Sequence, residues 1–153
     1  MISSPLENWH FLVGEWRGYS KDQFGGEGLI ETSSLFTLEM NARYLMSVHE
    51  ARREGALENQ SVALMFYDTR NRRFLRKTFF SYGFVNNEVE YMSSDSEIRF
   101  EITSEPNPEA FASMRWRSYV RRVSEYEVRM GLECADEGED FVSYGETIME
   151  RVK

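Results

Sequence analysis

The chain has 153 residues, of which 41% are hydrophobic, 14% aromatic and 29% charged, and its formal net charge is −8 at pH 7. A chain of this length can bury roughly 70% of its unfolded surface in one domain, and its aromatic content excludes a disordered protein. The acidic balance excludes nucleic acid as the expected partner, because phosphate binding depends on clustered Lys and Arg.

Two local basic clusters, Arg70 to Lys77 and Arg115 to Arg122, stand against this acidic background. We interpret both as outward faces of strands that pair with Glu-rich neighbours, an arrangement that also discourages edge aggregation.

Cys134 is the single cysteine, so an intrachain disulfide is excluded and a reducing compartment is expected. The opening Met-Ile-Ser-Ser-Pro lacks the basic start and apolar core of a secretory signal. No apolar run approaches the roughly 20 residues of a membrane-spanning helix. These features predict a cytoplasmic, soluble protein with no membrane partner.

The chain begins with a short predicted helix from Pro5 to Leu12. Ser3 or Ser4 can cap it, and Pro5 suits its first position. Leu6, Trp9 and Leu12 fall three residues apart and would cover one face.

From Gly14 onward the hydrophobic period is two, which indicates strands. Turn residues divide this region, with Gly25-Gly26 marking a turn and Pro106-Asn107-Pro108 a long loop. The predicted strands start at Gly14 and then cover 28–39, 42–52, 61–67, 73–81, 84–91, 97–103, 112–122, 125–134 and 140–152. About ten short antiparallel strands predict an all-β fold, an up-and-down β-barrel with the N-terminal helix plugging one end, as a single domain over residues 1–153. A barrel of this strand number is wide enough to leave an internal cavity.

Alternation along the strands predicts which side chains face the interior. The predicted inward positions are Tyr44, Met46, Val48, Phe74, Phe80, Ile98, Phe100, Met114, Trp116, Val120, Tyr126, Val128 and Met130. Arg76 has the inward parity of its strand and could hold a carboxylate or phosphate, although a bulge between Arg73 and Phe80 would turn it to solvent. From these positions and the last strand, the candidate ligand-binding residues are Tyr44, Met46, Val48, Phe74, Arg76, Phe80, Phe100, Met114, Trp116, Met130 and Tyr144.

Catalytic and metal chemistry find little support in the sequence. His10 and His49 are the two histidines, and they are too far apart in the chain, with one cysteine, to predict a zinc site. The 26 acidic residues single out no catalytic pair. We therefore expect no catalytic residue and no metal ligand, and a binding protein in preference to an enzyme.

The stretch from Asn8 to Tyr19, with its Gly14-x-Trp16-x-Gly18 motif after an apolar helical turn, resembles the opening of the calycin barrels, the lipocalins and fatty-acid-binding proteins. Within that group the chain is most similar to the nitrobindin-type haem-binding-like barrels and their bacterial relatives. The resemblance implies that Trp16 closes one barrel end and that Arg151 packs on its ring.

Nitrobindin-type barrels bind haem through a histidine on the last strand, and the resemblance implies reactions with nitrogen oxides. Here the last strand, Phe141 to Arg151, contains no histidine, and Tyr144 lies near the expected position. No cofactor is therefore expected, with haem as the alternative. Arg117-Ser118-Tyr119 resembles the Arg-x-Tyr pair of fatty-acid-binding proteins but comes two strands too early, and its parity points outward.

The sequence thus predicts an intracellular protein that binds or carries a small hydrophobic or amphipathic molecule inside a barrel. Two alternatives stay open: a nitrobindin-like haem protein, and a barrel-shaped interaction module with no ligand whose interior is filled by its own side chains. A homodimer is compatible with each of them.

Overall fold

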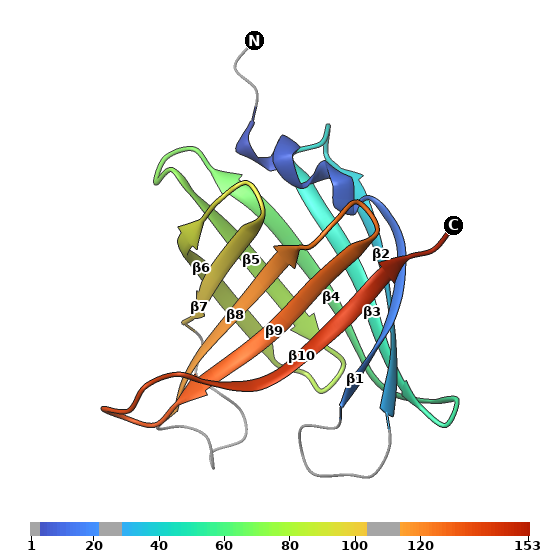
Figure 1. The fold of residues 1–153 in the computed structure, drawn as a ribbon. Coiled ribbons are helices and arrows are strands. Elements are labelled where there is room, and N and C mark those ends of the chain that lie inside the picture. The colour runs from blue at the N-terminus through green and yellow to red at the C-terminus, as the bar shows by residue number, and fades with distance from the viewer. Residues whose placement is uncertain (1–3, 22–28, 104–113) are drawn as a thin grey trace.

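The computed structural model describes residues 4–21, 29–103 and 114–153, which form one short helix and ten strands (Figure 1). The predicted Gly25-Gly26 turn and Pro106-Asn107-Pro108 loop lie outside the described residues. The elements are η1 (Pro5–Leu12), β1 (Gly14–Lys21), β2 (Leu29–Glu39), β3 (Tyr44–Arg53), β4 (Ala56–Asp68), β5 (Arg73–Phe80), β6 (Val85–Ser93), β7 (Glu97–Ile102), β8 (Arg115–Arg122), β9 (Glu127–Ala135) and β10 (Val142–Arg151).

Each strand pairs antiparallel with its neighbour in sequence, and β1 pairs with β10 to close the sheet. The predicted all-β, up-and-down barrel is therefore confirmed. At the closing seam Trp16 lies opposite Arg151 and Gly18 opposite Met149. A β-carbon at position 18 would collide with the backbone carbonyl of Ile148, so the close approach of β1 and β10 requires glycine there.

The helix η1 lies across one end of the barrel (Figure 1). It is a 3₁₀ helix, and three residues per turn place Leu6, Trp9 and Leu12 on one side, each at most 1% exposed. The Ser4 hydroxyl accepts a hydrogen bond from the Leu6 N–H at 3.3 Å and caps the helix. The predicted plugging helix is thus present with the predicted bounds.

Trp16 and Arg151 fasten this plug to the barrel. Trp16 is fully buried, and its Nε1–H donates to the Leu12 carbonyl at 2.7 Å. The Arg151 guanidinium lies 4.5 Å from the Trp16 ring centre and donates to the carbonyls of Val13 and Phe11. The predicted contact between the two side chains is confirmed, and a cation–π contact of this kind contributes about 1 kcal/mol.

On β3 the inward face is the opposite of the predicted one. Leu45, Ser47 and His49 line the interior, so strand alternation turns Tyr44, Met46 and Val48 outward. The prediction fails here because the outward face, with Tyr44, Met46 and Val48, is more apolar than the inward face, which carries Ser47 and His49. Placing the more apolar face inside therefore reverses this strand. Tyr126, also predicted to face inward, is 58% exposed.

The outer surface of β7–β10 carries a ladder of Arg and Glu. Arg99 contacts Glu97 at 2.9 Å and Glu133 at 2.6 Å. Arg121 contacts Glu97, and Arg117 contacts Glu101, both at 3.2 Å. This confirms that the basic cluster on β8 pairs with neighbouring acids.

The same ladder includes Tyr119, whose ring lies over Gly131 in the position that a β-carbon would need. The Tyr119 hydroxyl donates to Glu146 on β10. Burial, together with the hydrogen bond and charge of Glu146, raises the pKa of Tyr119 to about 12. Tyr119 therefore packs on β9 and bonds to β10 on the outside of the barrel, as the outward parity of Arg117 and Tyr119 predicts. Separately, no helix among the described residues has the length and apolar character to cross a membrane.

Candidate binding cavity

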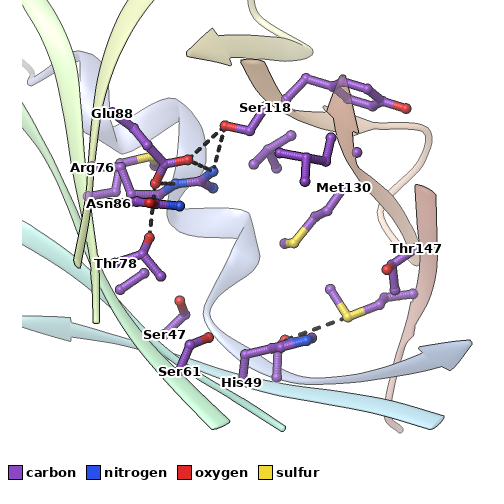
Figure 2. A pocket seen from close by; sticks show the side chains of 18 of the residues that line it. Ser47, His49, Ser61, Arg76, Thr78, Asn86, Glu88, Ser118, Met130 and Thr147 are labelled. Atoms are coloured by element: carbon purple, nitrogen blue, oxygen red, sulfur yellow. Dashed lines mark hydrogen bonds and ion pairs between the residues drawn. The ribbon is translucent and has the colours of Figure 1, made fainter. Parts of the chain in front are cut away.

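A cavity of about 340 Å³ lies inside the barrel (Figure 2). The end of the cavity next to η1 is apolar and is formed by Leu12, Phe36, Leu45, Met65, Val120 and Met149. The remaining wall carries a polar belt of Ser34, Ser47, His49, Ser61, Arg76, Thr78, Asn86, Glu88, Ser118 and Thr147. The barrel is therefore not filled by its own side chains, which removes the main premise of the interaction-module alternative.

The strongest feature of the belt is the ion pair between Arg76 on β5 and Glu88 on β6, which lie opposite each other in the sheet. The guanidinium donates through Nε at 2.8 Å and through Nη2 at 2.6 Å, one bond to each carboxylate oxygen. The Ser118 hydroxyl donates to Glu88 at 2.7 Å and accepts from Arg76 at 3.0 Å, while the Thr78 hydroxyl donates to Glu88 at 2.9 Å. The predicted inward orientation of Arg76 is confirmed.

This network keeps Glu88 ionised although the side chain is only 4% exposed. Burial alone raises the pKa of the Glu88 carboxyl. The charge of Arg76 and the hydrogen bonds from Arg76, Ser118 and Thr78 outweigh burial and leave the pKa below its ordinary value. The pair is therefore charged and internally neutralised, and neither partner needs a ligand to satisfy it.

On a neighbouring part of the wall, His49 forms a hydrogen bond between its Nδ1 and the Ser34 hydroxyl at 2.7 Å. Ser34 also lies 3.6 Å from the Met149 sulfur. Burial lowers the pKa of His49, and the nearby Glu50 opposes that shift only in part. Because Ser34 is bonded to Nδ1 of a neutral imidazole, Nε2 is the ring nitrogen that can form a hydrogen bond with a ligand.

The sequence-predicted ligand-binding residues fall into four groups. Arg76, Phe80 and Met130 line the cavity. Phe74 and Phe100 face inward but are buried in the core, where Phe100 lies 4.7 Å beneath the Arg76 guanidinium. Met114, Trp116 and Tyr144 lie outside the set of residues that line the cavity, and the Trp116 and Tyr144 rings pack edge to face at 4.9 Å. Tyr44, Met46 and Val48 lie on the outer surface.

Sequence reasoning missed the polar half of the wall. Ser47, Ser61 and Thr147 each have at least one apolar outward neighbour, and Figure 2 shows them around the same space as His49 and Met130. A search for apolar parity passes over such residues. The signal that could have found them is the pair of polar residues at alternate positions on each strand, Ser47-x-His49 on β3 and Asn59-x-Ser61 on β4.

Metal chemistry gains no support from the described residues, since no group of three His, Cys, Asp or Glu side chains among them could hold an ion. Tyr144 does not fit a haem ligand, because it sits at an irregularity between Ser143 and Gly145, packs on Trp116 and is not on the cavity wall. Cys134 is buried, and burial followed by the charge of Asp136 raises the pKa of its thiol, so it is not an activated nucleophile.

No protein-family model and no curated protein matches the chain. Solved structures do match. The crystal structure of Rv2717c from M. tuberculosis is similar over 100% of both chains, with a TM-score of 0.72 and 14% identity. The S-type phycobiliprotein lyase CPES from Guillardia theta is similar over 99% of this chain and 94% of its own, with a TM-score of 0.56 and 13% identity. At these identities the likeness shows the fold alone, a closed antiparallel β-barrel.

Proposed function

We propose that the barrel binds one small amphipathic molecule whose polar end carries no net charge. One observation carries this proposal: the cavity joins an apolar end to a polar belt in which Arg76 is already paired with Glu88. The neutral character of the polar end replaces the acidic head group that the sequence suggested.

The size and lining of the cavity limit the ligand. A volume of about 340 Å³ is at the lower end of the roughly 300 to 1,000 Å³ found for small-molecule sites. Met65, Met130 and Met149 contribute thioethers that adapt to irregular shapes. The apolar part of the ligand is therefore a ring system or short chain, not a long acyl tail.

The polar belt suits groups that both donate and accept hydrogen bonds. Ser47, Ser61 and Thr147 offer hydroxyls, and His49 offers a ring nitrogen. An entering carboxylate would have to compete with Glu88 for the Arg76 guanidinium and would meet a buried like charge. A hydroxyl, amide or carbonyl meets no such penalty.

Binding is favoured over catalysis for this cavity. The Ser34 hydroxyl and the His49 imidazole form a nucleophile and base pair, but Ser34 is only 3% exposed. One of the similar solved structures is that of a phycobiliprotein lyase, so the fold is compatible with an enzyme. The described residues around Ser34 provide no third group that orients His49, which is the usual companion of such a pair.

The alternative of a nitrobindin-like haem protein that reacts with nitrogen oxides gains no ligand from β10. It would depend on the Nε2 of His49, in a cavity of about 340 Å³ that is at the lower end of the range for small-molecule sites. A small neutral ligand fits this volume better than a haem macrocycle, and we therefore favour it.

A matched pair of probes tests the proposal. The purified protein is titrated calorimetrically with 2-naphthalenemethanol and with 2-naphthoate, which share a ring system and differ in the charge of the polar end. We expect one alcohol molecule per barrel and affinity for the alcohol at least about tenfold higher. Equal or tighter binding of 2-naphthoate would overturn the neutral-ligand assignment. If neither probe binds and native mass spectrometry finds no copurified small molecule, the binding function itself fails.

A further inference from the structure

The outer surface of β2–β6 is as apolar as parts of the barrel interior. The strand register aligns one row across five strands: Leu35, Val48, Val62, Phe79 and Val85. Leu35 is 50% exposed and Phe79 is 43% exposed. A continuous apolar row on the outside of a closed barrel has no core to pack against.

Two further rows extend this surface toward η1. Tyr44, Phe66, Leu75 and Val89 form the last row, in which the Tyr44 and Phe66 rings lie 5.2 Å apart. The row between this row and the Leu35 row is mixed, with Met46 and Leu64 at its centre and Thr37, Lys77 and Asn87 on either side. We call these three rows the outer apolar face, and among the described residues that form it Lys77 is the one charged side chain.

The opposite wall of the barrel differs sharply. On β7–β10 the outward positions hold the Arg and Glu ladder, in which Arg99 and Arg121 are each paired with an acid. The charged side chains of the ladder make the β7–β10 wall suited to contact with solvent. Among the described residues, the outer apolar face has no comparable set of charged side chains. Its rim is polar, with Glu50 and Gln60 paired beyond one end and Glu39 beside Tyr44 at the other. An apolar centre with a polar rim is the usual anatomy of a protein–protein interface.

The area of the outer apolar face can be compared with the areas of apolar patches on monomers and of protein–protein interfaces. Five strands at about 4.8 Å spacing and three rows about 7 Å apart, with side-chain margins, cover roughly 25 by 20 Å, or about 500 Å². This is near the upper end for the largest apolar patch on a monomer. Because these five strands curve around half of the barrel, two such faces bury at most about 1,000 Å² in total, the size of a weak, concentration-dependent dimer.

We propose that the outer apolar face is the contact between two copies of this chain, packed sheet on sheet about a two-fold axis. The chain carries a net charge of −8, so two copies repel unless they meet where acidic side chains are absent, and this face meets that condition. The same charge opposes docking on an anionic membrane surface. The face is convex, because its five strands make up half of the closed barrel, so the two copies are expected to meet along its central strands, β3–β5.

Sedimentation velocity from about 1 to 200 µM tests the interface. The wild-type protein is expected to reach twice its monomer mass of 18.0 kDa with increasing concentration. Leu64→Glu, at the centre of the face, should remain monomeric throughout. Leu35→Glu, at a position already 50% exposed, is a second variant that does not threaten folding and should weaken the dimer at least about tenfold. Val142→Glu, 60% exposed on β10, is the matched control and should dimerise as the wild type does.

A monomeric wild type at the highest concentration would overturn the proposal. So would a dimer that persists in folded Leu64→Glu and Leu35→Glu proteins, since another surface would then form it. Cosedimentation of a wild-type monomer with phosphatidylcholine vesicles, lost in Leu35→Glu, would assign the face to a lipid surface instead. Thermal unfolding of each variant establishes that it is folded.

Discussion

The guanidinium of Arg76 and the carboxylate of Glu88 face each other across β5 and β6 with two short hydrogen bonds, on the wall of the internal cavity. Side-chain exposure is 17% for Arg76 and 4% for Glu88. Because each charge is neutralised by the other, the pair sets the chemical character of the cavity: polar, but without a net charge to offer a ligand.

Removing one member of this pair should destabilise the protein more than removing both. Arg76→Met leaves Glu88 buried without its counter-charge, and we expect a loss of about 3 kcal/mol in the free energy of unfolding. The double variant Arg76→Met/Glu88→Leu should recover a large part of that loss. Urea unfolding of the three proteins measures the difference. Arg17→Met, which breaks an exposed pair with Glu15, is the control and should change stability by at most about 0.5 kcal/mol. A single variant as stable as this control would contradict the described burial.

Stability should fall on the acid side of neutrality through His49. Burial lowers the pKa of His49 in the folded protein, so as pH falls below the ordinary value of 6.5 the unfolded chain binds a proton before the folded one does. This contribution is present above pH 6.5 and decreases as pH falls toward the lower, folded pKa. His49→Gln should show a flatter dependence between about pH 7 and 5 in urea unfolding. NMR titration of the ring should give a pKa below 6.5, and a value at or above it would be inconsistent with a buried neutral imidazole.

Gly18 should be intolerant of substitution because of the closing seam. In Gly18→Ala the new methyl group meets the Ile148 backbone carbonyl, which cannot rotate away, so β1 and β10 must separate. We expect a loss of at least about 2 kcal/mol and faster amide exchange at the β1–β10 pairs. Ser20→Ala on the same strand, opposite Thr147, is the control. If Gly18→Ala retains the wild-type exchange pattern at the seam, the close approach is not as described.

Haemin should not be ligated by this protein. Tyr144 packs on Trp116 away from the cavity wall, and the cavity of about 340 Å³ beside His49 is at the lower end for small-molecule sites, too small for a haem macrocycle. A haemin titration is therefore expected to give no shift of the Soret band beyond that of free haemin. A shifted band that is lost in His49→Ala would reverse this expectation, while one lost in Tyr144→Phe would contradict the position of the β10 ring.

The sequence predicts the barrel fold better than it predicts the residues that line the cavity. The ten strands and the plug follow from turn residues and hydrophobic period, which are local signals. The Trp16–Arg151 contact was expected only from the resemblance that the Gly-x-Trp motif carries. On β3 the outward face is the more apolar one, so the assumption that the apolar face lies inside reversed Tyr44, Met46 and Val48. The parity of Arg76 was right, but its partner Glu88 could not be identified, because pairing across strands depends on register and 26 acids compete for the role.

The reversal of β3 has a physical cause. A prediction from alternation takes the apolar face of a strand as the inner one, and on β3–β5 the outer face is apolar. Ser47 and Ser61, which line the cavity, are then assigned to the outer surface by the sequence pattern. Strands whose outward face is more apolar than their inward face indicate a second surface that becomes buried, which here is the proposed contact between copies.

The most direct test of ligand binding compares two adjacent positions on β3. Ser47 lines the cavity and Met46 faces outward, so Ser47→Phe fills the interior whereas Met46→Phe leaves it unchanged. Calorimetric titration with 2-naphthalenemethanol should give one site per barrel in the wild type and in Met46→Phe, and at least about tenfold weaker binding, or none, in Ser47→Phe. Equal binding by all three folded proteins would show that the molecule does not enter the barrel and would contradict the central claim.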